Sequence, residues 1–127
     1  MKKVFMLLAL SARLASAQAA DVTGKWRAEF DTQVGMQKYL YTVAKNGASF
    51  TGTAVAEVGG QSRTVELKDV SLKGDTLTFS ETLEFQGNTV PITYRGVVAG
   101  DQIKFVRKVA DFATEELVAK REKGAGA

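Results

Sequence analysis

The 127-residue chain contains no cysteine and no histidine, and it has a single proline. Without cysteine the folded domain has no disulfide, so a hydrophobic core has to stabilise it alone. Without histidine, the common zinc sites, His-activated nucleophiles and His-based pH switches are excluded. An enzyme built from this chain would have to use carboxylates, tyrosine, lysine or arginine. We therefore predict no metal site and no cofactor, and we name no catalytic residue.

The first twenty residues have the pattern of a secretory signal peptide. The basic start from Met1 to Lys3 is followed by the apolar stretch from Val4 to Leu10 and then by small residues. Seven apolar residues are too few for a membrane-spanning helix, which needs about 20. We expect cleavage after Ala17, Ala19 or Ala20, which would place the mature protein in the periplasm or outside the cell. The alternative is a buried N-terminal helix.

Removal of residues 1–20 would leave a domain without net charge. The chain has 17 Lys and Arg against 14 Asp and Glu, and Lys2, Lys3 and Arg13 lie in the first twenty residues, where no acid is found. A neutral domain gives no electrostatic reason to expect nucleic acid or an anionic membrane as a partner. We therefore predict a protein that binds no nucleic acid. Because the apolar stretch at residues 4–10 is short, we also predict no transmembrane segment.

Turn signals containing glycine divide the rest of the chain at regular intervals. Asn46-Gly47, Gly74-Asp75 and Gly100-Asp101 lie about 27 residues apart, with Gly59-Gly60 and Gly87-Asn88 roughly halfway between them. Between these turns apolar and polar residues alternate, which is typical of strands with one buried face. We predict strands over residues 23–30, 38–44, 50–57, 63–72, 76–85, 89–99 and 102–109.

The stretch after residue 110 is ambiguous, because its composition favours helix and Asp111 could cap one. We favour a turn to about Thr114 and then an eighth strand to Arg121, since seven antiparallel strands would leave two edges exposed. The sequence therefore predicts an all-β, eight-stranded antiparallel up-and-down meander barrel over residues 21–121, followed by a flexible tail at 122–127. The alternative is a two-sheet β-sandwich.

Two-residue loops at the glycine pairs predict how the strands face one another. A type I′ turn at Asn46-Gly47 would place Tyr41 opposite Gly52 and Tyr39 opposite Ala54. The strand over residues 63–72 changes face midway along its length. We therefore predict a β-bulge at Lys68-Asp69.

Three polar residues are predicted to point into the apolar interior at one level. The turn at Gly87-Asn88 would pair Glu81 with Tyr94, and the turn at Gly100-Asp101 would pair Tyr94 with Arg107. Buried charge is costly unless it is paired. This row is therefore either a satisfied network that specifies strand register or a set of groups that bind the polar end of a ligand.

Smaller and aromatic residues are predicted beside these polar groups. Tyr39 and Tyr41 would line the same space as candidate ligand-binding residues. Gly52, Ala54 and Gly96 would either leave room for a ligand or accommodate the tyrosine rings.

Gly24-Lys25-Trp26 at the start of the first strand, followed by a meander that contains Phe50-Thr51-Gly52-Thr53, resembles the calycins. This group comprises lipocalins, fatty-acid-binding proteins and avidin-like barrels. The resemblance implies a barrel closed at one end by Trp26, with Arg121 packed over its ring in a cation–π contact. The chain is also similar to small secreted bacterial proteins of unassigned function, a similarity that implies no activity.

If Trp26 and Arg121 close one end, the mouth lies at the other. The apolar residues predicted near the mouth are Val34, Met36, Phe85, Val109 and Phe112. They would suit access by a lipid-like or aromatic molecule, or they would plug the barrel.

The sequence leaves three functions open. We favour an exported barrel that binds a small apolar ligand in an interior cavity. The first alternative is a structural or interaction module that binds protein or polysaccharide. The second is a carboxylate-dependent hydrolase acting on carbohydrate, which would pair Glu81 with Asp111 at the rim.

Overall fold

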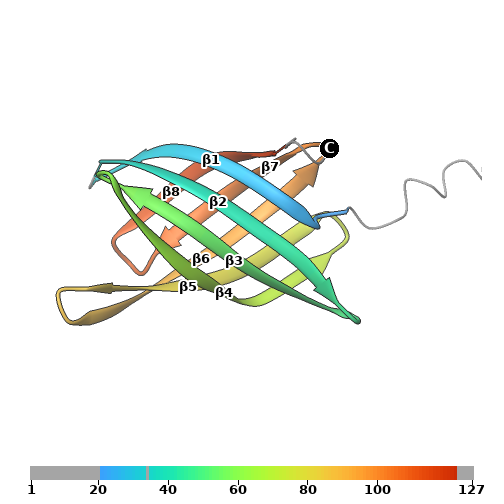
Figure 1. The fold of residues 1–127 in the computed structure, drawn as a ribbon, viewed down its shortest axis with the longest axis horizontal. Helices are drawn as coiled ribbons and strands as arrows, with labels where there is room; N and C mark the ends of the chain where they lie inside the picture. Colours follow the sequence, from blue (N-terminus) through green and yellow to red (C-terminus); the bar gives the residue numbers. More distant parts are fainter. Residues whose placement is uncertain (1–20, 34, 123–127) are drawn as a thin grey trace, which may run out of the picture.

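Eight antiparallel strands close into a barrel in which neighbouring strands follow chain order (Figure 1). The structure is a computed structural model and describes residues 21–33 and 35–122. The strands are β1 (Gly24–Thr32), β2 (Gly35–Asn46), β3 (Ser49–Val58), β4 (Gln61–Lys73), β5 (Thr76–Phe85), β6 (Asn88–Ala99), β7 (Gln102–Val109) and β8 (Ala113–Arg121). The predicted fold class is confirmed, and the sandwich alternative is wrong. The predicted signal peptide at 1–20 and residues 123–127 of the predicted tail lie outside the described residues.

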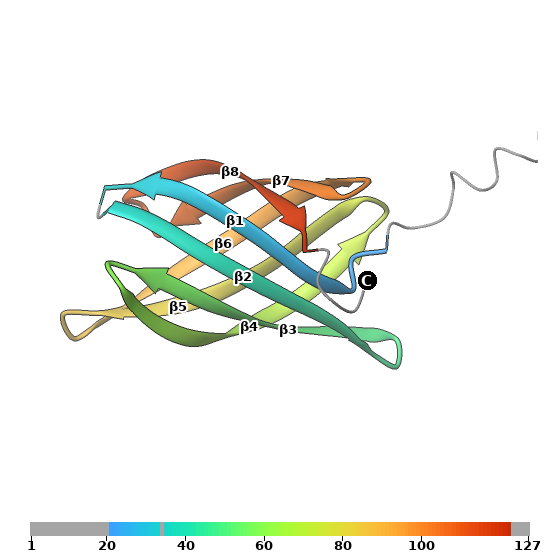
Figure 2. The same ribbon diagram turned by 45° about the horizontal axis from the view of Figure 1, so that its top comes forward.

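Strand β8 closes the barrel by pairing with β1, where Trp26 lies opposite Arg121. Figures 1 and 2 both show the two strands side by side. The chain reverses between β7 and β8 in a short turn, in which Ala110 has a φ of 47°. The helix considered for residues 111–121 is therefore not found, and the eighth strand expected from the exposed sheet edges is present.

Three turns at one end of the barrel have glycine at the first loop position. These loops are Gly47-Ala48, Gly74-Asp75 and Gly100-Asp101, and their glycines have φ values of 65°, 63° and 63°. Glycine with positive φ at the first central position is typical of a type II′ hairpin turn. The prediction of a type I′ turn centred on Asn46-Gly47 is wrong, because that turn lies one residue later.

The displaced turn changes the predicted pairing of β2 with β3 by two positions. Tyr41 lies opposite Ala54, not Gly52, and Tyr39 lies opposite Ala56. Because side chains alternate with a period of two, this even shift leaves each residue on its predicted face.

The β5–β6 pairing also differs from the prediction by two positions, in the opposite direction. Its loop is Gln86-Gly87, with φ values of 54° and 80°, where the sequence suggested Gly87-Asn88. Glu81 consequently lies opposite Ile92 rather than Tyr94. The predicted pairing of Tyr94 with Arg107 is confirmed.

A register shift between Lys68 and Ser71 interrupts the β4–β5 ladder. Asp69, inside this interval, has a φ of 55°. The β-bulge predicted at Lys68-Asp69 is therefore confirmed. It allows Val70 and Leu72 to pack against the core after the change of face.

The half of the barrel around Trp26 is filled by aromatic side chains. Next to Trp26, the rings of Tyr41, Phe79, Tyr94 and Phe105 contact one another with centroid separations of 4.6 to 5.8 Å. All five side chains are buried. This aromatic layer separates the closed end from the rest of the interior.

The small residues of the interior make room for packed side chains. A Cβ on Gly96 would lie 2.5 Å from the Phe105 ring, and one on Gly52 would lie 2.9 Å from Leu67. Gly52 and Gly96 therefore leave no open space for a ligand. They accommodate Leu67 and Phe105, not the tyrosine rings that the sequence suggested.

Candidate ligand-binding site

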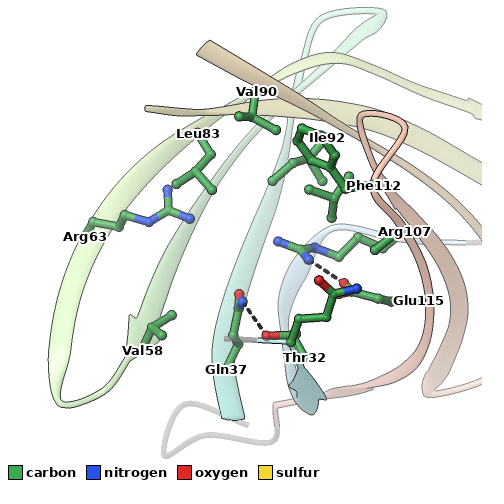
Figure 3. A pocket seen from close by; sticks show the side chains of 13 residues that line it. Thr32, Gln37, Val58, Arg63, Leu83, Val90, Ile92, Arg107, Phe112 and Glu115 are labelled. Atoms are coloured by element: carbon green, nitrogen blue, oxygen red, sulfur yellow. Dashed lines mark hydrogen bonds and ion pairs between the residues drawn. The ribbon is translucent and has the colours of Figure 1, made fainter. Parts of the chain in front are cut away.

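A cavity of about 640 Å³ opens at the end of the barrel opposite Trp26 (Figure 3). This size lies within the range of natural small-molecule sites, roughly 300–1,000 Å³. Its apolar lining consists of Val58, Leu83, Val90, Ile92, Val109, Phe112 and Ala113, and its polar lining of Thr32, Gln33, Gln37, Arg63, Arg107 and Glu115. Several strands contribute residues to this lining, because the inward-facing side chains of adjacent strands lie side by side at this end of the barrel.

The predicted mouth residues are only partly found in this lining. Val109 and Phe112 line the cavity, and Phe112 is 71% exposed. Met36 is half exposed. Val34 and the side chain of Phe85 lie outside what the structure describes.

Two arginines approach the cavity from opposite sides. Figure 3 shows Arg63 of β4 and Arg107 of β7 with their guanidinium groups pointing towards each other. At the rim, Gln37 is buried and its amide nitrogen donates a hydrogen bond of 3.1 Å to the Thr32 hydroxyl. The cavity therefore combines an apolar wall with a few convergent polar groups, as is typical of small-molecule sites.

On the inner side of Arg107, the Tyr94 hydroxyl is the centre of a buried hydrogen-bond network. It donates to Glu81 Oε2 over 2.7 Å. It accepts from Arg107 Nε over 2.8 Å and from the Tyr41 hydroxyl over 3.1 Å. One donated and two accepted bonds use the full capacity of a phenol oxygen. Tyr94 is therefore completely satisfied without a ligand.

The Tyr39 hydroxyl has the same arrangement beside it. It donates to Glu81 Oε1 over 3.3 Å and accepts from Arg107 Nη2 over 3.2 Å and from Arg63 Nη2 over 3.3 Å. Arg63 Nη2 also lies 3.7 Å from Glu81 Oε1. Each oxygen of the fully buried Glu81 carboxylate thus accepts a hydrogen bond from a tyrosine hydroxyl. We call Glu81, Tyr39, Tyr41, Tyr94, Arg63, Arg107 and Glu115 the polar layer.

Glu115 forms the shortest hydrogen bond of Arg107. The two residues face each other across β7 and β8, and Arg107 Nη1 lies 2.5 Å from Glu115 Oε1. The guanidinium also lies 5.2 to 5.6 Å from the ring centroids of Phe30, Tyr39 and Tyr94. These ring contacts favour the cation in a site where only 2% of the Arg107 side chain is exposed.

Burial determines the protonation of the tyrosines. It raises the pKa of Tyr41 and Tyr94 well above 10, and it raises that of Tyr39. Burial lowers the pKa of Arg107, but the oxygens of Tyr94 and Tyr39 and the bond to Glu115 outweigh it, so the net shift is upward. At neutral pH the tyrosines are therefore uncharged and Arg107 is a cation.

The structure brings together all five predicted ligand-binding residues. Glu81, Tyr94, Tyr39 and Tyr41 lie behind Arg107, and of the five Arg107 is the one that lines the cavity. The contacts match the satisfied network considered as one alternative. A direct role of the other four in ligand binding stays a prediction.

Two further members of the polar layer, Arg63 and Glu115, were missed by the sequence reasoning. Both could have been found from the alternation of side chains along a strand. Arg63 lies on the same face of β4 as the buried residues Val65 and Leu67, and Glu115 lies on the same face of β8 as Leu117. Following the alternation to the ends of β4 and β8 would have identified both.

At the closed end, the Arg121 guanidinium lies 4.2 Å from the centroid of the Trp26 ring. Its Nη1 donates to the Thr23 carbonyl over 2.8 Å, and its Nη2 to the Asp21 carbonyl over 2.7 Å. Trp26 Nε1 in turn donates to the Val22 carbonyl over 3.0 Å. This is the stacked pair that the resemblance to calycins implied, and it attaches residues 21–23 to the end of the barrel.

The two carboxylates considered for catalysis, Glu81 and Asp111, lie in different environments. Glu81 is fully buried behind the cavity, whereas Asp111 is exposed on the β7–β8 turn. Within residues 21–33 and 35–122, no group of three or more acidic side chains is placed to hold a metal ion. Among the same residues, no helix is long and apolar enough to cross a membrane.

Fold and site together define a closed eight-stranded antiparallel β-barrel with a cavity at one end and a buried polar layer at its base. This architecture is consistent with a calycin-like fold. Comparison with known proteins finds no matching family model, no matching curated protein and no matching solved structure. The geometry of the site is therefore the basis for its proposed function.

Proposed function

We propose that the barrel binds a small, mostly apolar molecule in the cavity at its mouth. The single observation that carries this proposal is the cavity of about 640 Å³, with an apolar wall and with Arg107 at its base. The wall would contact the hydrocarbon part of the ligand. Arg63 and Arg107 would donate hydrogen bonds to its polar end.

The distribution of packing supports the proposal. The aromatic layer fills the closed half of the barrel, and the hydrophobic core extends from it to Ile92 in the wall of the cavity. The cavity leaves apolar surface of Leu83 and Phe112 facing open space. Burial of such surface by a ligand is favourable by about 25 cal/mol per Å².

We further propose that binding takes place after export, in the periplasm or outside the cell. The support is the signal-like pattern of residues 1–20, with its basic start and short apolar stretch.

A fluorescent apolar probe tests the function. N-phenyl-1-naphthylamine is uncharged and increases its emission in apolar sites, and we expect saturable binding to the unaltered barrel. Leu83→Trp would fill the cavity and weaken binding by about tenfold or more, equivalent to about 1.4 kcal/mol. Thr82→Trp adds the same ring to the outer face of β5 and should bind like the unaltered protein. Absence of saturable binding, or equal binding by the two variants, would contradict the proposal.

A further inference from the structure

The charges of the polar layer cancel at the base of the cavity. Arg63 and Arg107 supply two positive charges, and Glu81 and Glu115 supply two negative ones. Three of these four side chains are at least 85% buried, and Arg63 is 35% exposed. In a site with little water, interactions between charges are much stronger than in solution. The base of the cavity is therefore electrically balanced before any ligand binds.

Arg107 nevertheless keeps hydrogen-bonding capacity. A guanidinium has five N–H groups. Three of those on Arg107 donate to Tyr94, Glu115 and Tyr39. The other two have no hydrogen-bond partner among residues 21–33 and 35–122. Since Arg107 lines the cavity, it can donate to a ligand without giving up Glu115.

We propose that the polar end of the ligand is a neutral hydrogen-bond acceptor, such as a ketone, ester or hydroxyl oxygen, and that Glu115 selects against anions. This inference rests on the proposed function and specifies its ligand class. A neutral oxygen can accept from Arg107 while the Arg107–Glu115 pair stays intact. A carboxylate would bring a third negative charge next to Glu115 and Glu81, or would have to displace Glu115 from Arg107. An ammonium group would face two guanidinium groups.

Ligands of equal chain length and different head group test the proposal. 2-Decanone, decanoate and decylammonium are titrated at pH 7.5 in competition with N-phenyl-1-naphthylamine. We expect the ketone to bind at least about tenfold more tightly than either ion, because only the ions unbalance the charge of the site. Decanoate binding as tightly as the ketone, or more tightly, would overturn the inference.

Glu115→Gln tests the role assigned to Glu115. It keeps the shape of the side chain and removes its charge, so decanoate affinity should rise by about tenfold while ketone affinity changes little. Glu116→Gln is the matched control, because it removes the same charge from an exposed position of β8. Equal effects of the two variants on decanoate affinity would show that Glu115 does not select against anions.

The outcomes separate this inference from the proposed function. If neither the probe nor the ketone binds, the proposed function itself fails. If both bind and decanoate competes equally well, the function stands and the ligand class is wrong. The comparison of head groups on the unaltered protein decides the ligand class even if Glu115→Gln does not fold.

Discussion

The Tyr94 hydroxyl lies 2.7 Å from the Glu81 carboxylate, although the two residues do not face each other in the sheet. Tyr94 is opposite Phe79 on β5, and the length of its side chain lets it reach Glu81 two residues further along. The same hydroxyl accepts a hydrogen bond from Arg107. One oxygen therefore connects a buried anion on β5 with a buried cation on β7.

Loss of the Tyr94 hydroxyl should destabilise the fold more than loss of the Tyr41 hydroxyl. Tyr94→Phe leaves Glu81 and Arg107 each short of a partner, and we expect the free energy of unfolding to fall by about 3 kcal/mol. Tyr41→Phe removes a single neutral bond to Tyr94 and should cost about 1 kcal/mol. Urea denaturation of both variants measures the difference. Equal losses would show that Tyr94 is not the centre of the network.

The close packing around Gly96 predicts a severe effect of one methyl group. In Gly96→Ala the new Cβ would clash with the Phe105 ring and Ile103. Overpacking of this kind lowers the free energy of unfolding by about 2 kcal/mol. Adding Phe105→Leu should recover part of the loss because it removes the ring. Thermal unfolding of the single and double variants tests this. A single variant as stable as the unaltered protein would contradict the packing described here.

A substitution at the closed end should lower stability without changing binding at the mouth. Arg121→Met removes the cation–π contact with Trp26 and the hydrogen bonds to the carbonyls of Asp21 and Thr23. We expect the free energy of unfolding to fall by about 2 kcal/mol. Amide exchange near Val22 should become faster, while probe binding at the mouth stays unchanged. Arg27→Met breaks only an exposed pair and should have little effect, as surface ion pairs contribute little. Loss of probe binding in Arg121→Met would refute the separation.

Alkaline pH should destabilise the barrel through its buried tyrosines. Burial raises their pKa in the folded protein, whereas in the unfolded chain they ionise near 10. Above that pH the unfolded state binds fewer protons than the folded state, so stability is present below about pH 10 and is lost as the pH rises further. Each tyrosine contributes up to about 1.4 kcal/mol per pH unit.

Tyr41→Phe isolates one such contribution. Its free energy of unfolding should fall less steeply between pH 10 and pH 11.5 than that of the unaltered protein. The difference in slope should correspond to the release of about one proton on unfolding. Urea denaturation at several pH values measures both slopes. Identical slopes would mean that Tyr41 ionises alike in the folded and unfolded states.

The alternation of apolar and polar residues predicted the strands, their order and the faces of Glu81, Tyr94 and Arg107. It did so because a period of two is unaffected by an even error in register. The turns were less predictable. A glycine beside a polar residue does not reveal which of two adjacent pairs forms the loop, and the loop Gln86-Gly87 requires a positive φ at a residue other than glycine.

Whether the interior is filled or hollow could not be predicted from the sequence. Gly96 is compatible with open space and also with the Phe105 ring that occupies it. Only the three-dimensional packing distinguishes the two, because the rings that fill this part of the interior come from four strands, β2, β5, β6 and β7. The alternation places Glu115 on the inner face of β8, whereas its pairing with Arg107 depends on the register between β7 and β8.

Methyl NMR with the neutral ligand tests the central claim most directly, because it locates the binding site within the barrel. Titration of 2-decanone into methyl-labelled protein should shift the methyl signals of Leu83, Val90 and Ile92, which line the cavity. The methyl signals of Leu77 and Ile103 in the filled half should stay in place. Absence of shifts at the cavity, or shifts confined to exposed valines of the outer face, would contradict a binding site at the mouth.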